Sequence, residues 1–333
     1  MRARRIVFPA PREARVEQFD LDGASDPGRV LLEAEASVVS PGTEGASFRG
    51  GHTIGQAAYP VTPGYAWIGR VLRAAGQEGG PRTGHRVLVM APHASHATID
   101  PEANLWVRVP EGLAAPEAAL ARLVAVPATT LRTTRARPGD WVAVVGLGVI
   151  GLCAALLFRS CGYRVVVVDV LPARCDRARR LGLEHVLEAS AEGIGEAIQD
   201  LTAGGVHLAI DASGNVRGEL LAVRSARREA EVVLLGTPWF GGGDEPIADL
   251  FQLIHLRFLH VRSGWEWSLP LRPSPHARGS IQENLEFALR LIAEGRIPAA
   301  ELLTGVVPPE DAQRIYTELA ESSADCLTFA FRW

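Results

Sequence analysis

Cysteine is scarce in this sequence of 333 residues, which contains only Cys153, Cys161, Cys175 and Cys326. None of the four forms a C-x-x-C pair, so their spacing excludes both a disulfide framework and a structural zinc cluster of thiolates. Free and mostly buried thiols are the expected state, as in a reducing cytoplasm. We therefore expect a cytoplasmic globular protein.

An excess of one charge is also absent, because the formal net charge is −4 and the arginines are scattered along the chain. This balance argues against binding to nucleic acid or to a membrane surface. The longest apolar run, "WVAVVGLGVIGLCAALLF", contains the glycines of a turn, so a strand, a turn and a buried helix explain it better than a membrane span. The opening "MRARRIVFPAP" is not followed by a long apolar core, so no secretory signal is expected. A small-molecule substrate is the expected partner.

Short apolar runs interrupted by Gly and Pro occupy residues 4–109 and predict an irregular β domain. From residue 116 to about residue 264, apolar runs alternate with helical patterns, which is typical of a doubly wound α/β domain with a parallel sheet. Two further helical patterns and a last apolar run follow. We therefore predict one domain from residues 1–122 and 271–333, and a nucleotide-binding domain at residues 123–270.

The segment "VVGLGVIG" places Gly146, Gly148 and Gly151 in the G-x-G-x-x-G spacing, with Val149 and Ile150 before the last glycine. It lies between a predicted strand and a predicted helix. This context is typical of a loop that holds the pyrophosphate of a dinucleotide at a helix N-terminus. A merely structural turn is the alternative.

The next predicted strand ends in Asp169, about twenty residues further on, where an acidic residue bonds the ribose hydroxyls. A carboxylate there would repel a 2′-phosphate, so the sequence favours NAD(H) over NADP(H). Arg174 follows closely, and it either stacks on the adenine or lies on a solvated helix face.

The order of these parts resembles the medium-chain dehydrogenase/reductase superfamily over essentially the whole chain. The motifs are "SPGTEGASFRG", "YPVTPGYAWIGRV", "GHRVLV", "AALARL" and "VVGLGVIG". The S-x-GTE loop, the PGY in place of GHE and the "PHA" segment are similar to the bacteriochlorophyllide a dehydrogenase-like branch. The resemblance implies a GroES-like irregular β catalytic domain, a Rossmann doubly wound parallel-sheet domain that binds NAD, and a homodimer formed partly by residues 259–264. Further candidate cofactor-binding residues are Ser213, Gly236 and Ser263.

Zinc-using members of that superfamily carry a cysteine ligand before the Gly-Thr-acid triplet, a histidine in GHE, and a third ligand in the helix that enters the nucleotide domain. The matching positions here hold Pro41, Tyr65 and Arg122. Proline cannot ligate, a phenol rarely does, and a guanidinium repels a cation, so we expect no zinc. His93 and His96 would need a third ligand to bind a metal, and an ordinary hydrogen-bonded histidine is the simpler interpretation.

Without a metal, side chains must accept the proton of the substrate hydroxyl and stabilise its oxygen. The resemblance makes Thr43, Tyr65, Glu44 and His93 the candidate catalytic residues. The alternative for Tyr65 is a half-buried aromatic residue without a catalytic role. Glu44 either ends a proton relay or only locks the conformation of the loop predicted at residues 37–51. The candidate substrate-pocket residues are His52, Arg122, Trp239, Trp265 and Trp267. Plain packing is the alternative for the tryptophans.

Three functions follow from these observations. The first is a zinc-independent, NAD(H)-linked dehydrogenase that acts on a secondary alcohol or its ketone in specialised metabolism. The second is an NAD(P)H-dependent reductase of enones or quinones. The third is a nucleotide-binding protein without catalytic activity.

Overall fold

The computed structural model describes residues 1–51, 58–189, 193–238, 247–321 and 326–333. It divides into unit 1, which comprises Met1–Ala125 and Pro270–Trp333, and unit 2, which comprises Val126–Leu269. The predicted boundaries, after residues 122 and 270, lie close to this division. The helix α2 (Ala115–Thr133) contains the first boundary.

Unit 2 contains a six-stranded sheet in the order β10-β9-β8-β11-β12-β13, and all neighbouring pairs are parallel. This is the strand order of doubly wound dinucleotide-binding domains, so the predicted α/β fold class is confirmed. The strands are β8 (Trp141–Val145), β9 (Arg164–Asp169), β10 (His185–Glu188), β11 (Val206–Asp211), β12 (Ala226–Leu234) and β13 (His260–Ser263). The helices are α3 (Val149–Ser160), α4 (Pro172–Arg180), α5 (Ile194–Leu201), α6 (Val216–Ser225), α7 (Ile247–Arg257) and the 3-10 turn η1 (Glu266–Ser268).

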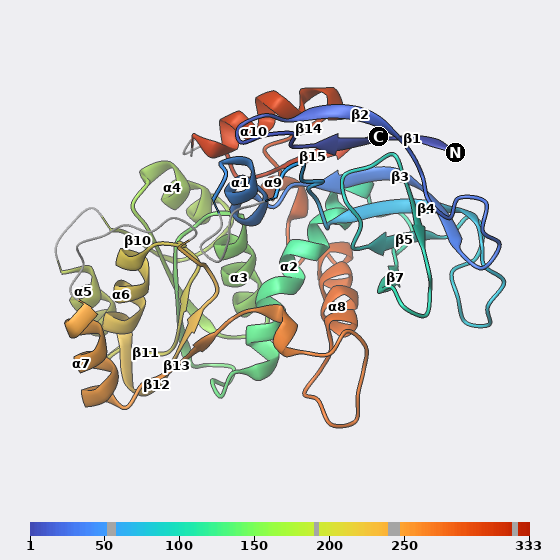
Figure 1. Ribbon diagram of the computed structural model, residues 1–333. Helices are drawn as coiled ribbons and strands as arrows, with labels where there is room; N and C mark the ends of the chain where they lie inside the picture. Colours follow the sequence, from blue (N-terminus) through green and yellow to red (C-terminus); the bar gives the residue numbers. More distant parts are fainter. Residues whose placement is uncertain (52–57, 190–192, 239–246, 322–325) are drawn as a thin grey trace. The chain divides into compact units, whose positions relative to one another are not determined.

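The central strands of unit 2 are apolar throughout because helices cover both faces of a parallel sheet. Every residue of β8 is buried, and so is every residue of β9 after Arg164. The helices α3 and α4 contact β8, β9 and β10. The helices α5, α6 and α7 lie beside the sheet (Figure 1). Ile198, Val223 and Leu250 of these helices belong to one core with the strands.

Unit 1 contains a two-stranded antiparallel sheet and a larger, mostly antiparallel sheet in the order β14-β15-β3-β4-β5-β7, in which β6 pairs with β3. The strands are β1 (Arg2–Val7), β2 (Arg15–Asp20), β3 (Val30–Val38), β4 (Trp67–Arg73), β5 (Arg86–Val89), β6 (His96–Ile99), β7 (Trp106–Arg108), β14 (Gly305–Val307) and β15 (Phe329–Arg332). Its helices are α1 (Pro41–Phe48), α8 (Ile281–Ala293), α9 (Ala299–Leu302), α10 (Ala312–Ala320) and the 3-10 turn η2 (Pro309–Asp311).

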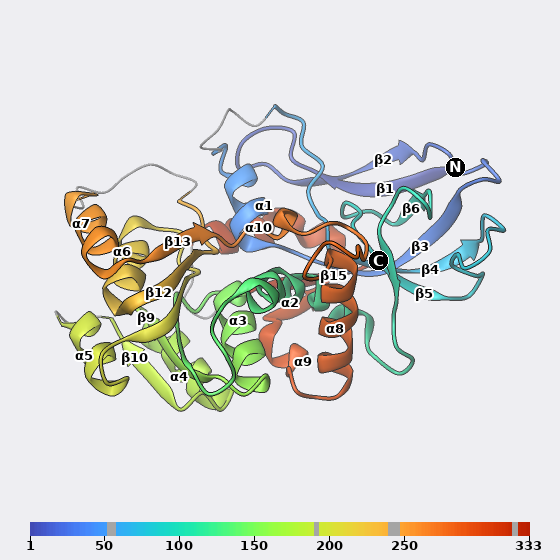
Figure 2. The same ribbon diagram turned by 90° about the horizontal axis from the view of Figure 1, so that it is seen from below.

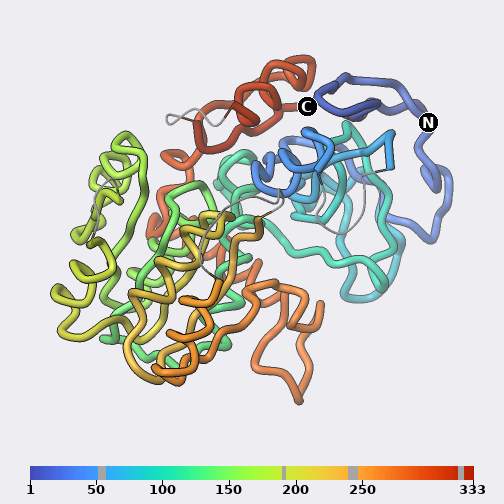
Figure 3. The backbone as a smooth tube through the Cα atoms, turned by 60° about the vertical axis from the view of Figure 1, so that its left-hand side comes forward, coloured from blue at the N-terminus to red at the C-terminus, as the bar shows by residue number. Residues whose placement is uncertain are grey.

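The C-terminal segment completes unit 1, because β15 pairs antiparallel with β3 and parallel with β14. The helices α1 and α10 lie side by side (Figures 1 and 2), and the rings of Phe8, Phe48 and Tyr316 pack against one another at their contact. Figure 3 shows the red C-terminal segment beside the blue N-terminal strands. Both ends of the chain therefore build this unit.

The prediction of a loop over residues 37–51 was wrong at its centre, where Pro41–Phe48 form α1. Pro41 starts the helix, where a missing amide N–H costs nothing. The Glu44 Oε1 atom accepts a hydrogen bond of 2.8 Å from the backbone N–H of Ser40, the N-cap residue. This resembles one half of a capping box. The two glycines of the helix, which favoured a loop, are outweighed by the burial of its inner face.

Candidate functional site

The glycine loop of unit 2 connects β8 directly to α3. Gly146 has a φ of 92°, and a Cβ atom on Gly151 would lie 1.8 Å from the Gly146 carbonyl oxygen, so glycine is required at both positions. A Cβ on Gly148 would meet no heavy atom of the described residues within 4 Å. Val149 is buried and Ile150 is half-buried at the start of α3. Gly148, the N-cap, offers no side chain to the first helical amides, so this backbone fits the pyrophosphate of a dinucleotide.

Asp169 ends β9 beside this loop and is buried. Its Oδ2 atom accepts a hydrogen bond of 2.6 Å from the Leu147 N–H, and its Oδ1 atom accepts one of 2.9 Å from the Leu171 N–H. The Arg174 guanidinium lies 3.6 Å from Oδ2. Asp169 therefore fixes the glycine loop, and Arg174 offsets part of its negative charge, which is neither of the two placements expected for Arg174.

Ser213 lies against the glycine loop, since a Cβ on Gly146 would be 2.7 Å from the Ser213 Cα. Its backbone N–H and its hydroxyl both donate to Oδ1 of Asp211, at 3.1 and 2.5 Å. Gly236 lies at the same edge of the sheet, and a Cβ atom on Gly236 would be 2.6 Å from the Gly214 backbone nitrogen. Burial raises the pKa of Asp211, and the hydrogen bonds from Ser213 oppose that shift. Asp211 is not among the predicted site residues, although an acidic residue at the end of a buried strand is the same signal that identified Asp169.

The remaining candidates of unit 2 lie at its surface or outside the described residues. Ser263 ends β13, and its Oγ atom accepts a hydrogen bond of 3.0 Å from the Trp265 N–H. Trp265 is 68% exposed and Trp267 is 48% exposed, so neither is packed into a core. Trp239 and, in unit 1, His52 lie outside the residues that the structure describes.

Tyr65 and Arg122 meet in unit 1. The Tyr65 hydroxyl donates a hydrogen bond of 2.6 Å to Oγ of Ser40, which precedes Pro41. The Arg122 guanidinium, in a residue only 2% exposed, lies 4.8 Å from the centroid of the Tyr65 ring. Two of the three positions that the resemblance matches to zinc ligands are thus in contact, and Ser40, which precedes Pro41 at the third, is bonded to Tyr65. They present a phenol and a cation.

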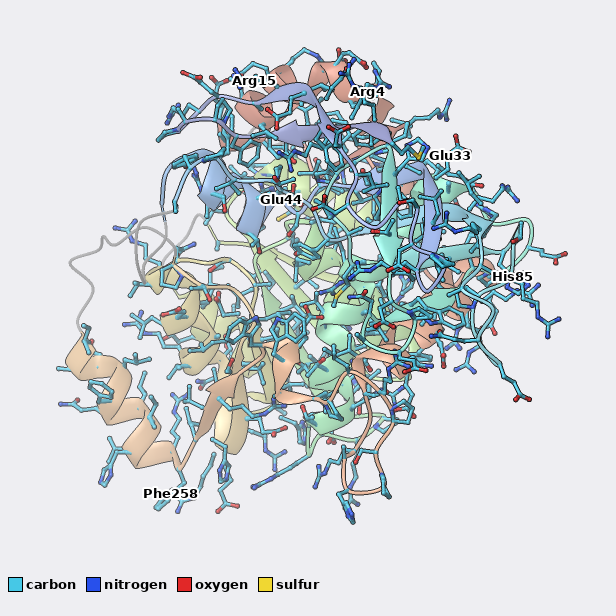
Figure 4. The ribbon with its side chains drawn as sticks, turned by 45° about the vertical axis from the view of Figure 1, so that its right-hand side comes forward. Arg4, Arg15, Glu33, Glu44, His85 and Phe258 are labelled. Atoms are coloured by element: carbon cyan, nitrogen blue, oxygen red, sulfur yellow. The ribbon has the colours of Figure 1, made fainter. Side chains whose placement is uncertain are left out.

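Glu44, labelled in Figure 4, lies on α1 and is buried. Besides the Ser40 N–H, it bonds Nε2 of His93 at 2.9 Å and the Tyr316 hydroxyl at 2.5 Å, both through Oε2. Burial and the charge of Glu44 raise the pKa of Tyr316 well above 10, so this phenol stays protonated and donates. These contacts support a locking role for Glu44.

His93 is completely buried, and each of its ring nitrogens has a partner, because Nδ1 lies 2.8 Å from Oγ of Ser37. The Trp333 indole N–H donates to the same Ser37 oxygen at 2.9 Å. Thr43, by contrast, is exposed on the first turn of α1. Of the four candidate catalytic residues, Thr43 and the half-buried Tyr65 offer atoms outside the buried network.

The described residues contain no group of three or more His, Cys, Asp or Glu side chains that could hold a metal ion. His96 has its own partners, because Nδ1 bonds Oγ of Ser95 at 3.0 Å and Nε2 lies 4.0 Å from Oε1 of Glu33. The proline, phenol and guanidinium described above do not fit zinc. Within the described ranges, no helix has the length and apolar character needed to cross a membrane.

Residues 149–268 match the family model described as zinc-binding dehydrogenase. An uncharacterised zinc-type alcohol dehydrogenase-like protein of Escherichia coli is 42% identical over 99 residues, which cover 29% of this chain and 28% of that protein. A similarly described protein of Haemophilus influenzae is 23% identical over 350 residues, covering 96% of each chain. The relative with the higher identity, from Escherichia coli, is therefore matched over less than a third of its length.

Two solved structures share the fold of the whole chain. One is a zinc-binding dehydrogenase-like protein of Sinorhizobium meliloti bound to NADP, with a TM-score of 0.81, 19% identity and full coverage of both chains. The other is an Escherichia coli alcohol dehydrogenase, described as short-chain, in complex with NADH. It has a TM-score of 0.79 and 18% identity, and covers 100% of this chain and 99% of its own.

Proposed function

We propose that this protein, whose residues 149–268 match the zinc-binding dehydrogenase family model, transfers hydride between NAD(H) and a secondary alcohol or its ketone, without zinc. The observation that carries the proposal is the contact of the Tyr65 phenol with the Ser40 hydroxyl and the Arg122 guanidinium. This cluster stands where the resemblance puts zinc ligands. A phenol next to a cation is suited to exchange a proton with a substrate oxygen.

The proposed roles divide between the two units. The glycine loop and α3 of unit 2 bind the pyrophosphate, and a bound nicotinamide supplies the hydride acceptor or donor. In unit 1, Tyr65 takes or gives the proton of the substrate hydroxyl, and the Arg122 charge favours the ionised phenol. The Thr43 hydroxyl bonds the substrate oxygen. Glu44 and His93 hold α1 in place and do not touch the substrate.

The preference for NAD(H) rests on the carboxylate of Asp169, which repels a 2′-phosphate. Arg174 weakens this argument, because its guanidinium lies 3.6 Å from the carboxylate. The NADP-bound neighbour has the same fold. An NADPH-dependent reductase of enones or quinones is therefore the second candidate.

A homodimer along β13 is part of the same proposal. This strand ends the six-stranded sheet of unit 2, three of its four residues are exposed, and all described residues of α7 are exposed or half-buried. Exposed strand edges pair readily with other chains. Light scattering on the purified protein tests this, and a monomer at micromolar concentration would contradict it.

Turnover with and without a chelator tests the main proposal. We expect NADH to bind more tightly than NADPH in a fluorescence titration, and oxidation of secondary alcohols to survive treatment with EDTA. Tyr65→Phe should lower kcat by about 10²–10⁴ while leaving NADH binding unchanged. Activity that is lost on chelation and restored by zinc would refute the metal-free mechanism. Tight NADH binding without turnover of any alcohol, ketone or enone would favour a non-catalytic protein.

A further inference from the structure

Ser40 is the N-cap residue of α1, but its hydroxyl is not used as an N-cap. A serine at this position usually accepts a hydrogen bond from an amide of the first turn, as Ser280 does at α8, where it accepts from the Glu283 N–H at 3.2 Å. Among the described residues, the Ser40 side chain accepts none from the amides of α1. It lies instead 2.6 Å from the phenolic oxygen of Tyr65.

The position of Ser40 is fixed through its backbone. Its backbone N–H donates to Oε1 of Glu44, whose Oε2 is bonded to His93 and Tyr316. Ser40 is only 4% exposed. Its hydroxyl therefore meets Tyr65 in a defined geometry.

Among the described residues, charged and titratable groups linked to this pair lie on α1, α2 and α10 and in the segment before β6. Arg122 of α2 places a positive charge 4.8 Å from the Tyr65 ring. Glu44 of α1 is the negative group, and its oxygens are engaged by the Ser40 N–H, by His93 before β6 and by Tyr316 of α10. A serine hydroxyl both donates and accepts, so it can bond a phenol in one state and a phenolate in the other. The separation of 2.6 Å falls in the range of charge-assisted O–H···O⁻ bonds.

We propose that Ser40 is a positioning residue that stabilises the ionised form of Tyr65 by donating its hydroxyl hydrogen to the phenolate oxygen. The proposal rests on the proposed function. During oxidation, the substrate O–H bond breaks and its proton goes to the phenolate. The carbinol C–H bond breaks and its hydride goes to the oxidised nicotinamide, so that a C=O bond forms. Ser40 keeps its own proton and turns from donor to acceptor.

A spectroscopic titration tests this without a known substrate. The chain contains four tyrosines, and burial raises the pKa of Tyr59, Tyr163 and Tyr316. The near-ultraviolet phenolate signal of Tyr65 is isolated by subtracting the alkaline titration of Tyr65→Phe from that of the wild type. We expect Ser40→Ala, compared with its own Tyr65→Phe double variant, to move the midpoint upward by about one pH unit, a tenfold change in the ionised fraction. Ser40→Thr, which keeps the hydroxyl, should restore the wild-type midpoint.

Ser280→Ala is the matched control, because it removes a serine hydroxyl that does cap a helix. It should lower Tm without moving the Tyr65 midpoint, whereas Ser40→Ala should move the midpoint with little change in Tm. A Ser40→Ala protein that keeps its circular dichroism and the wild-type midpoint would overturn the proposal, as would an equal shift in Ser40→Thr. If the midpoint shifts but no alcohol is oxidised with NAD, the role of Ser40 stands and the proposed function fails.

Discussion

The glycine loop of unit 2 and the Tyr65 cluster of unit 1 are built on opposite principles. The loop works because side chains are missing, so that Gly151 can touch the backbone of Gly146 and Gly148 stays open. The cluster of Tyr65, Ser40 and Arg122 instead depends on polar side chains packed next to it, among which Glu44 and His93 are buried and hydrogen-bonded to each other. In the proposed function, the first region presents its backbone to an anion. The second would orient one phenol by means of its buried polar groups.

The largest effect that separates the two regions is expected at Gly151. In Gly151→Ala the new Cβ would lie 1.8 Å from the Gly146 carbonyl, which forces the loop apart and should cost about 3 kcal/mol or more and abolish NADH binding. Gly148→Ala is the control, since its Cβ meets no described atom within 4 Å but would face the pyrophosphate in the proposed binding mode. It should fold normally and bind NADH more weakly. Urea denaturation and NADH fluorescence measure both, and a stable Gly151→Ala protein that binds NADH would contradict this account of the loop.

Glu44→Gln should be the most damaging of the conservative changes in unit 1. The amide keeps the shape of the side chain but turns one acceptor into a donor among the Ser40 N–H, His93 and Tyr316. We expect a loss of about 2–4 kcal/mol in the free energy of unfolding. Glu310→Gln breaks the exposed ion pair with Arg4 and should cost less than about 1 kcal/mol. Equal urea midpoints for the two variants would show that the buried network around Glu44 does not stabilise unit 1.

The two units should also respond to different ranges of pH. Burial raises the pKa of Asp211 in unit 2, so the folded state binds this proton more tightly than the unfolded state. Its contribution to stability is therefore present at low pH and lost as pH rises from the unfolded value of about 4 through the raised value. Asp211→Asn, which removes the titrating group, should flatten that dependence.

In unit 1 the matching group is Tyr316, whose pKa is raised well above 10. Its contribution is lost only in strong alkali, so Tyr316→Phe should leave the acid-side dependence unchanged. Urea midpoints measured at several pH values compare the two variants. An unchanged slope in Asp211→Asn would show that another group, such as the neighbouring Glu219, carries the acid-side effect.

The smallest of these effects is expected for Arg174→Ala. Without the guanidinium, the negative charge of Asp169 would be less compensated, so the proposed repulsion of a 2′-phosphate should grow and the preference for NADH over NADPH should rise by about threefold to tenfold. Arg179→Ala, on the same helix but paired with Asp176, is the control and should leave the ratio of dissociation constants unchanged. A ratio that moves toward NADPH in Arg174→Ala would reverse the assignment.

The sequence predicted the glycine loop because its determinants are local. Strand, glycine spacing, helix and the acidic end of the next strand all lie within residues 141–169, and the fold class followed from the alternation of strands and helices. The same local signal was present at Asp211, where it was overlooked. How Arg174 pairs could not be predicted, since a guanidinium on a long stem reaches several partners.

The buried network of unit 1 could not be predicted because its members are far apart in the sequence. Glu44 and Tyr316 are separated by 272 positions, and Ser37 and Trp333 by 296. Nothing near Glu44 indicates that its carboxylate will be buried. The helix α1 was missed for the same reason, since its two glycines favour a loop and only distant packing partners stabilise it.

The bond between Glu44 and Tyr316 also has a consequence for synthesis on the ribosome. At a translation rate of roughly 5–20 residues per second, Glu44 is made on the order of tens of seconds before its partner. All of unit 2 is synthesised in that interval. It therefore has time to collapse before α10 of unit 1 has been synthesised. A nascent chain released before residue 316 would lack the Tyr316 hydroxyl, so Oε2 of Glu44 would keep only its hydrogen bond to His93.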